Sequence, residues 1–190
     1  TVFSDVKTFQ DRLASNGNGS ITALQTIYVP ADDLSDPAVQ MIQHELDSTI
    51  VLSRAVAAQG IRPAVDILAS KSSLLTPEVV GERHYDLATR ATAILQKYES
   101  LKGIIAIIGE SELSAEDRDD YLKAKELIQF FSQRFNVMEK VTGVPGEHIT
   151  REQTLDGVEK IIGKAKGAPT EDSPVPEPAL SAPETEPGEG

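Results

Sequence analysis

The residue types that could carry out catalysis by themselves are few in this sequence, and their spacing fits none of the usual sites. The three histidines, His44, His84 and His148, lie far apart and form no His-Glu-x-x-His pair of the kind that binds zinc. No serine lies in a Gly-x-Ser-x-Gly turn, and the sequence has no cysteine to act as a nucleophile or a thiolate ligand. We therefore interpret the histidines as surface or helix-end residues and identify no self-sufficient active site.

The glycine-rich segments do not predict a phosphate site either. A phosphate-binding loop needs two correctly spaced glycines, followed by Lys and then Ser or Thr, directly after a strand. Gly163-Lys-Ala-Lys-Gly167 lacks a glycine at the required position, and Gly17-Asn-Gly19 precedes an expected strand.

Composition limits the classes of partner. The 190 residues include 18 Lys and Arg against 30 Asp and Glu, a formal net charge of −12. Binding to nucleic acid needs a clustered basic face, so this acidity argues against a nucleic-acid partner and against docking on anionic lipid. No apolar run reaches the roughly 18 residues of a membrane-spanning helix, so we expect no direct membrane insertion. The chain begins with Thr1 and not with Met, which suggests a fragment or a processed product.

Residues 167–190 predict a disordered, acidic, Pro-rich tail. They contain six Pro and six Asp or Glu, with no Lys or Arg. Ordering a backbone costs roughly 1–2 kcal/mol per residue, and this segment has almost no apolar material to offset that cost. The tail is either an interaction segment or a solvating appendage.

The first 76 residues predict part of an α/β sheet. Apolar residues at helical spacing predict a helix over residues 3–15, and β-branched and aromatic residues predict a buried strand over residues 21–29. Pro37 begins a second helix, and Ile50-Val-Leu52 is a further strand candidate. This order is typical of an α/β unit, but two strands alone do not make a stable sheet face.

Residues 77–166 predict a compact helical bundle. A long helix begins at Pro77 and ends at Gly109, and we expect its last apolar stretch, residues 104–108, to be buried. One face of this helix is marked by Tyr85, Ala88, Ala91, Leu95, Tyr98 and Leu101. Two capping boxes, in which a hydroxyl accepts from a free backbone N–H group, are expected to begin later helices: Ser114 to Asp117 and Thr150 to Gln153.

Several segments, in the same order along the chain, resemble the beta subunit of the F-type ATP synthase. Residues 19–37 resemble the strand and loop that meet the central stalk in that family, and residues 63–72 match its signature run. Residues 111–117 are similar to its acidic DELSEED motif, and residues 131–143 fit its adenine-pocket segment. Further matches are residues 44–54, 80–86 and 104–109.

The resemblance implies an α/β segment from the C-terminal part of a RecA-like nucleotide-binding domain, residues 1–76. An all-α helical bundle domain, residues 77–166, and the acidic tail, residues 167–190, follow it. The phosphate loop and the magnesium ligands for ATP or ADP would precede Thr1, so the fragment alone is expected to be inactive. The implied partners are alpha-type subunits in a hexameric ring and a central stalk subunit. The implied location is the cytoplasmic face of a bacterial plasma membrane, as a peripheral complex.

The resemblance also assigns nucleotide-binding residues. Phe135, Arg62, Met138 and Val141 would hold the adenine, and Tyr28 would lie near the phosphates. Arg62 stands where the family has a stacking Tyr, and Val141 stands where it has a second Phe. The guanidinium of Arg62 could stack on the base instead. The alternatives are a solvated Arg62 and a Tyr28 that is only a buried strand aromatic.

Contacts with the central stalk are implied for a loop, through Asp33, Ser35 and Asp36, and for the acidic motif, through Glu112, Glu116 and Asp117. Ser111 and Ala115 replace two acids of the family motif, which should weaken an electrostatic contact with a basic partner. The loop residues could also be ordinary turn residues.

The resulting hypothesis is the catalytic subunit of a proton-translocating ATP synthase. One alternative is a non-catalytic or divergent subunit of a rotary ATPase, with a structural or regulatory role. Another is a free-standing helical binding module with an acidic tail.

Overall fold

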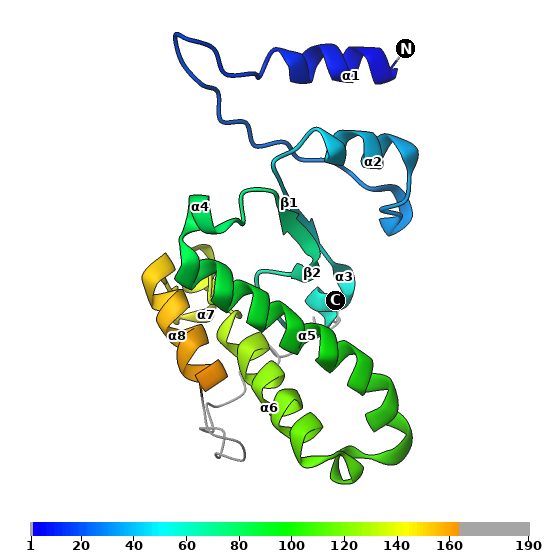
Figure 1. The fold of residues 1–190 in the computed structure, drawn as a ribbon, viewed down its shortest axis with the longest axis vertical. Coiled ribbons are helices and arrows are strands. Elements are labelled where there is room, and N and C mark those ends of the chain that lie inside the picture. Colours follow the sequence, from blue (N-terminus) through cyan, green and yellow to red (C-terminus); the bar gives the residue numbers. More distant parts are fainter. Residues whose placement is uncertain (1, 164–190) are drawn as a thin grey trace, which may run out of the picture. The chain divides into compact units, whose positions relative to one another are not determined.

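The computed structural model describes residues 2–163 (Figure 1). The predicted acidic tail, residues 167–190, lies outside the described residues. The chain divides into two compact units, Thr1–Thr49 with Ser70–Leu74 and Ile50–Ala69 with Leu75–Gly190, and each unit is described by itself.

The first unit contains α1 (Val2–Asp11), the 3₁₀ turn η1 (Pro30–Asp32) and α2 (Pro37–His44). Helix α1 ends before the predicted residue 15, and an antiparallel bridge between Asn16 and Gly19 turns the chain. The side-chain amides of Gln10 and Gln25 exchange two hydrogen bonds of 3.0 Å, which join α1 to the segment that follows. Pro37 occupies the first turn of α2, as predicted.

The buried strand predicted over residues 21–29 is wrong. This segment has no regular secondary structure, and Leu24 and Tyr28 are 96% and 79% exposed. Its burial still alternates along the chain, because Gln25, Ile27 and Val29 are partly buried while their neighbours are exposed. Extended residues become a strand only when a neighbouring strand takes their backbone hydrogen bonds, and the described residues place none beside this segment.

A two-stranded sheet pairs β1 (Ser48–Leu52) with β2 (Val65–Ser72). Strand β1 confirms the candidate at residues 50–52, whereas β2 was not predicted. Helix α3 (Arg54–Ala58) lies between the strands in the sequence and is capped by the hydroxyl of Ser53, which accepts from the amide of Val56. The Ser53 amide also donates to the carbonyl of Ala64 at 2.8 Å.

The second unit holds the predicted helical bundle. Its elements are α4 (Pro77–Val80), α5 (Glu82–Ile108), η2 (Glu110–Glu112), α6 (Ala115–Phe130), η3 (Asn136–Met138), α7 (Glu139–Thr142) and α8 (Arg151–Gly163). The single long helix predicted from Pro77 is divided at Gly81, whose φ of 86° is incompatible with a continuous helix. Gly109 ends α5 as predicted, with a φ of 89°.

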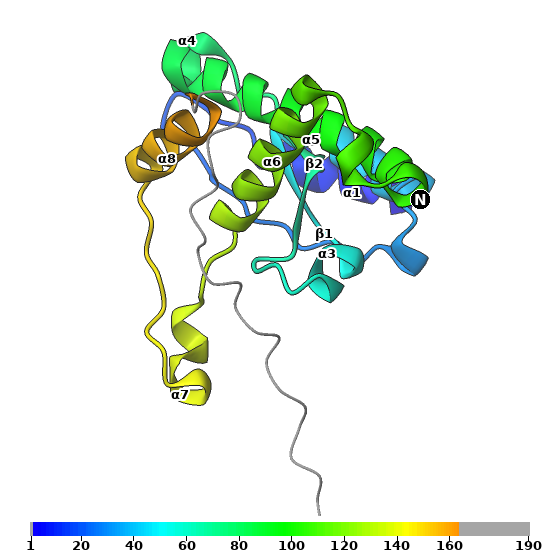
Figure 2. The ribbon, with the colours of Figure 1, turned by 90° about the horizontal axis from the view of Figure 1, so that it is seen from below.

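The core of the bundle is formed by α5, α6 and α8, which lie side by side in Figures 1 and 2. Leu127 of α6 is fully buried at its centre. Gly157 of α8 allows a close approach, because a Cβ atom there would overlap the ring of Phe130. The core side chains are Leu87, Ala91, Leu95, Ala124, Leu127, Leu155, Val158, Ile161 and Ile162.

Caps and ion pairs fix the helix ends and the helix packing. The Thr150 box is confirmed: Gln153 N donates to Thr150 Oγ1 at 3.3 Å, and Thr150 N donates to Gln153 Oε1 at 2.8 Å. Ser114 Oγ likewise accepts from the Asp117 amide at 3.1 Å. Separately, the guanidinium of Arg83 on α5 pairs with Asp156 and Glu159 on α8, at 2.6 and 2.5 Å.

Two further expectations about α5 are wrong. The stretch 104–108 was predicted to be buried, but Ile104 and Ile107 are 47% and 84% exposed. At this end η2 turns the chain back into α6, so only part of the circumference of α5 is covered (Figure 1). The predicted apolar face is confirmed at Ala91 and Leu95, which lie in the core, but it is wrong at Tyr85, which is 38% exposed.

Candidate functional site

The segment between α6 and α8 carries most of the predicted adenine-binding residues. We call residues 134–147 the pocket loop; it contains η3 and α7, and Figure 2 shows α7 at the end of an excursion away from the three packed helices. Phe135 directly precedes η3 with an extended backbone, Met138 ends η3, and Val141 lies in α7. Side chains three apart share a face in helical turns, so Met138 and Val141 lie on one side of the loop.

These side chains are accessible to a ligand. Phe135 is 39% exposed, Met138 45% and Val141 78%, whereas the aliphatic residues of the bundle core are buried. An exposed aromatic ring with two flexible or branched aliphatic neighbours suits a flat apolar ligand such as a purine base. The loop therefore exposes one aromatic and two aliphatic side chains to solvent.

The backbone of Arg62 lies against the residues that lead into the pocket loop. Its carbonyl accepts from the amide of Gln133 at 2.6 Å, and its amide donates to the hydroxyl of Ser132 at 3.3 Å. The bond between Arg62 and Pro63 is cis. The structure thus brings residue 62 and the start of the loop together, although they are 70 residues apart in the sequence.

The guanidinium of Arg62 is held by backbone carbonyls. Its Nη1 atom donates to Ala57 O at 3.0 Å and to Ile61 O at 2.9 Å. Arg62 is exposed but is not simply solvated, because these two bonds fix its plane beside the end of α3. A fixed plane could stack on a base without losing these bonds, since a guanidinium has further donors and two open faces.

Tyr28 belongs to the first unit. At 79% exposure it is not the buried strand aromatic that was the alternative interpretation.

All three predicted stalk-contact residues in the first unit are engaged in local hydrogen bonds. Asp36 caps α2, because its Oδ1 atom accepts from the amides of Ala38 at 2.8 Å and Val39 at 3.2 Å. Asp33 accepts from both the hydroxyl and the backbone amide of Ser35, and these two bonds lower its pKa below the ordinary value. This geometry is that of a turn followed by a helix cap, so any partner would meet a preformed loop.

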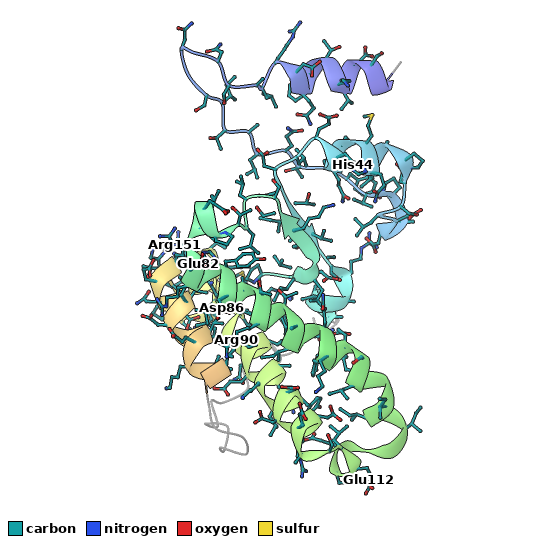
Figure 3. All side chains as sticks on the ribbon, viewed as in Figure 1. His44, Glu82, Asp86, Arg90, Glu112 and Arg151 are labelled. Atoms are coloured by element: carbon teal, nitrogen blue, oxygen red, sulfur yellow. The ribbon has the colours of Figure 1, made fainter. Side chains whose placement is uncertain are left out.

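The three acids of the predicted acidic motif differ from one another. Glu112 and Glu116 are exposed, and Figure 3 shows Glu112 at the tip where α5 leads into α6. Asp117 instead accepts from Lys97 Nζ at 2.9 Å and from the Ser114 hydroxyl at 2.7 Å, and Lys97 and Ser114 lower its pKa. Two acids are therefore available to a partner, while the third holds α6 to α5.

Sequence reasoning missed the charged residues that position the acidic motif and the pocket loop. Lys97 pairs with Asp117 and with Asp120, at 2.9 and 2.6 Å. The other missed pair is Arg134 with Glu147, whose Nη2 and Oε1 atoms are 2.7 Å apart. Neither pairing follows a helical or strand period in the sequence, so no pattern could have identified it.

Residues 2–163 contain neither a metal-binding cluster nor a membrane-spanning helix. No group of three or more His, Cys, Asp or Glu side chains in this range could hold a metal ion. None of the helices described is both long enough and apolar enough to cross a membrane.

Comparison with protein families gives two consecutive matches. Residues 1–72 match the nucleotide-binding domain of the ATP synthase alpha/beta family. Residues 74–144 match the C-terminal domain of V and A type ATP synthase. ATP synthase subunit beta of Coprothermobacter proteolyticus is 48% identical over 170 residues, which are 89% of this chain and 38% of that protein.

Two solved structures share the fold. The chain matches the ATP synthase subunit NeqB from Nanoarcheaum equitans with a TM-score of 0.75 and 22% identity, over 88% of this chain and 40% of that one. It matches the ATPase EscN of the enteropathogenic E. coli type III secretion system with a TM-score of 0.69 and 25% identity, over 85% and 37%. The chain thus spans less than half the length of these relatives. The predicted α/β segment followed by a helical domain is confirmed.

Proposed function

We propose, starting from the fact that this chain belongs to the ATP synthase alpha/beta family, that it is the C-terminal part of a catalytic beta subunit. The complete subunit would make ATP in a rotary complex driven by a transmembrane proton gradient, or hydrolyse ATP in reverse. The similarity to a beta subunit covers most of this chain but little over a third of that subunit.

The observation that carries the proposal is the set of exposed apolar side chains in the pocket loop, which follows two residues bonded to Arg62, Ser132 and Gln133. Phe135 would stack on the adenine of ATP or ADP, and Met138 and Val141 would contact its edge. Arg62, fixed by two carbonyls, would cover the base with its guanidinium plane. Tyr28 would lie near the phosphates, and magnesium and the phosphate loop would be contributed by residues preceding Thr1.

Rotation of the central stalk would be transmitted to this chain through contacts with exposed acids and with a preformed loop. In the acidic motif, Glu112 and Glu116 would meet a basic central stalk, and Asp117 would keep α6 aligned with α5. In the first unit, Ser35 and the free oxygen atoms of Asp33 and Asp36 would contact the stalk. Alpha-type subunits would complete a hexameric ring around it, peripheral to the cytoplasmic face of a bacterial plasma membrane.

A second candidate is a subunit of a V or A type complex, or a divergent non-catalytic member of the rotary ATPases. The match of residues 74–144 to the C-terminal domain of V and A type ATP synthase favours the first of these. Arg62 and Val141, which replace two aromatic rings of the beta-subunit pattern, favour the second. A Walker A lysine and an acid able to activate water, both upstream of Thr1, would support the catalytic assignment, and their absence would exclude it.

The adenine site is tested by equilibrium binding of ATP to the complete subunit. Phe135→Ala should weaken binding by about 1–3 kcal/mol, since it removes the ring that stacks on the base. Val137→Ala is a matched control, because Val137 lies in the same loop, is 81% exposed and is not a proposed contact. Equal affinity of the Phe135→Ala variant and the unchanged subunit would remove Phe135 from the site.

A further inference from the structure

The two ends of the pocket loop are joined by three hydrogen bonds between Arg134 and Glu147. Arg134 Nη2 donates to Glu147 Oε1 at 2.7 Å, and Arg134 N donates to Glu147 Oε2 at 3.2 Å. In return, Glu147 N donates to Arg134 O at 2.9 Å. One carboxylate therefore engages a guanidinium and a backbone amide of the same residue, thirteen positions away.

A second close contact lies one position further into the loop. A Cβ atom at Gly146 would overlap the backbone of Asn136, well inside van der Waals distance. Only glycine lets the two chain segments approach so closely. The loop is therefore closed by two neighbouring contacts, residue 134 with residue 147 and residue 136 with residue 146.

Inside the loop, the bonds that hold the proposed base-binding residues are local: Met138 N donates to Phe135 O at 3.0 Å, and Thr142 Oγ1 donates to Met138 O at 3.0 Å. Between the closing contacts, η3 and α7 together comprise only residues 136–142, and Phe135, Met138 and Val141 are exposed and outside the bundle core. Such short helical turns are unstable without closure of their ends, because each residue loses conformational freedom on ordering. The orientation of Phe135, directly after Arg134, depends most closely on this closure.

We infer that Arg134 and Glu147 form a clasp that positions Phe135, Met138 and Val141 for the base of the nucleotide. The inference rests on the proposed function of this loop. The clasp orders the loop before the ligand arrives, so binding does not have to order it. Both residues are positioning residues: the side chains of Arg134 and Glu147 are 61% and 36% exposed, and an exposed ion pair contributes little to overall stability.

The clasp is tested by reversing its charges in the complete subunit. Arg134→Glu and Glu147→Arg should each weaken ATP binding about five- to tenfold, because the loop then opens. The double variant Arg134→Glu/Glu147→Arg should recover most of the affinity. Binding of inorganic triphosphate, which has no base, should stay unchanged in all three variants. Arg151→Glu is a matched control with the same charge change, because Arg151 is exposed at the start of α8 and pairs with its neighbour Glu152 at 3.3 Å.

A second measurement reports on the loop without any nucleotide. In the 190-residue chain, Arg134→Glu should speed hydrogen exchange of the Glu147 amide, which is bonded to the Arg134 carbonyl, while amides at the centre of α6 keep their protection. Unchanged exchange at Glu147 would overturn the clasp.

The binding results separate failure of the clasp from failure of the proposed function. If the reversals leave ATP affinity unchanged while Phe135→Ala weakens it, the clasp is rejected and the adenine site remains. Loss of affinity in both single variants without recovery in the double variant also rejects the clasp, as an effect of charge alone. If Phe135→Ala has no effect, the base site itself is rejected, and the clasp with it.

Discussion

The helical bundle and the segment before it differ in how much of their own structure they bury. Helices α5, α6 and α8 share a core of nine buried residues. Between residues 4 and 74, by contrast, Val39 is the only buried side chain, and Ile50 and Leu52 of β1 are 70% and 73% exposed. A helix satisfies its backbone internally, whereas a strand needs neighbours, so the bundle can fold around its own core and the α/β segment needs further strands.

The largest expected effect comes from deleting a core side chain of the bundle. Leu127→Ala should lower the free energy of unfolding by about 2–5 kcal/mol, because Leu127 is fully buried and its loss leaves a cavity. Leu52→Ala, in the exposed part of β1, should change it by only about 0.5 kcal/mol or less. Urea denaturation of the 190-residue chain, followed by circular dichroism, measures both. Similar losses in the two variants would contradict the proposed difference.

The contact between α8 and α6 gives the next largest effect. Gly157→Ala should destabilise the bundle by about 1–3 kcal/mol, because the added methyl group overlaps the ring of Phe130. Helix propensity alone predicts the opposite sign, a gain of up to about 1 kcal/mol. Gly163→Ala, in the same helix with open space around the added atom, is the control for propensity. A stabilised Gly157→Ala variant would show that α8 packs less closely than described.

Helix caps should matter more in the bundle than in the α/β segment. Thr150→Ala removes one half of the reciprocal box at α8 and should cost about 1 kcal/mol in the unfolding of the bundle. Asp36→Ala removes the cap of α2. None of the nine core residues belongs to α2, so the unfolding temperature of the bundle should hardly change. Thermal melting of both variants would decide, and a larger shift for Asp36→Ala would reverse the comparison.

A smaller effect is expected from pH at the link between α5 and α6. Lys97 and Ser114 hold the pKa of Asp117 below its ordinary value of 3.8 in the folded chain. The unfolded chain therefore binds this proton more readily, and the contribution to stability is present above pH 3.8 and is lost as the pH falls through the lower folded value. Lys97→Met should flatten the decline in unfolding free energy between pH 5 and pH 2, roughly the range over which such carboxylates titrate.

Urea titrations at a series of pH values measure that slope, with Lys102→Met as the control. Lys102 pairs with Glu99 on its own helix, at 3.2 Å, and its ammonium lies 5.4 Å from the centre of the Tyr98 ring. It contacts neither Asp117 nor Asp120 in these pairings, so Lys102→Met should leave the slope unchanged. An identical slope in the Lys97→Met variant and the unchanged chain would remove the Lys97–Asp117 pair as its source.

The sequence predicts the ends of helices better than it predicts burial or strand pairing. The capping residues Thr150 and Ser114 and the terminator Gly109 were predictable because a helix end depends on a few adjacent residues. The burial of residues 104–108 was not, because an apolar run shows only that a surface is apolar and not that a neighbour covers it. The expected strand at residues 21–29 failed for a similar reason, since strand formation depends on partners distant in sequence.

The candidate site was predictable only in part. The resemblance assigned Phe135, Met138 and Val141, and their spacing of three residues is visible in the sequence. The hydrogen bonds of Arg62 to Ala57, Ile61 and Gln133, and the pairing of Arg134 with Glu147, depend on how the chain folds back on itself. No local pattern encodes such contacts.

Photolabelling tests directly whether the pocket loop and Arg62 hold the base of ATP. The complete subunit would be irradiated with 2-azido-ATP, and its peptides would be identified by mass spectrometry. We expect saturable labelling within residues 134–147. Excess ATP should compete with this labelling, and the Phe135→Ala variant should be labelled less. Saturable labelling confined to other segments, with none on this loop, would contradict it.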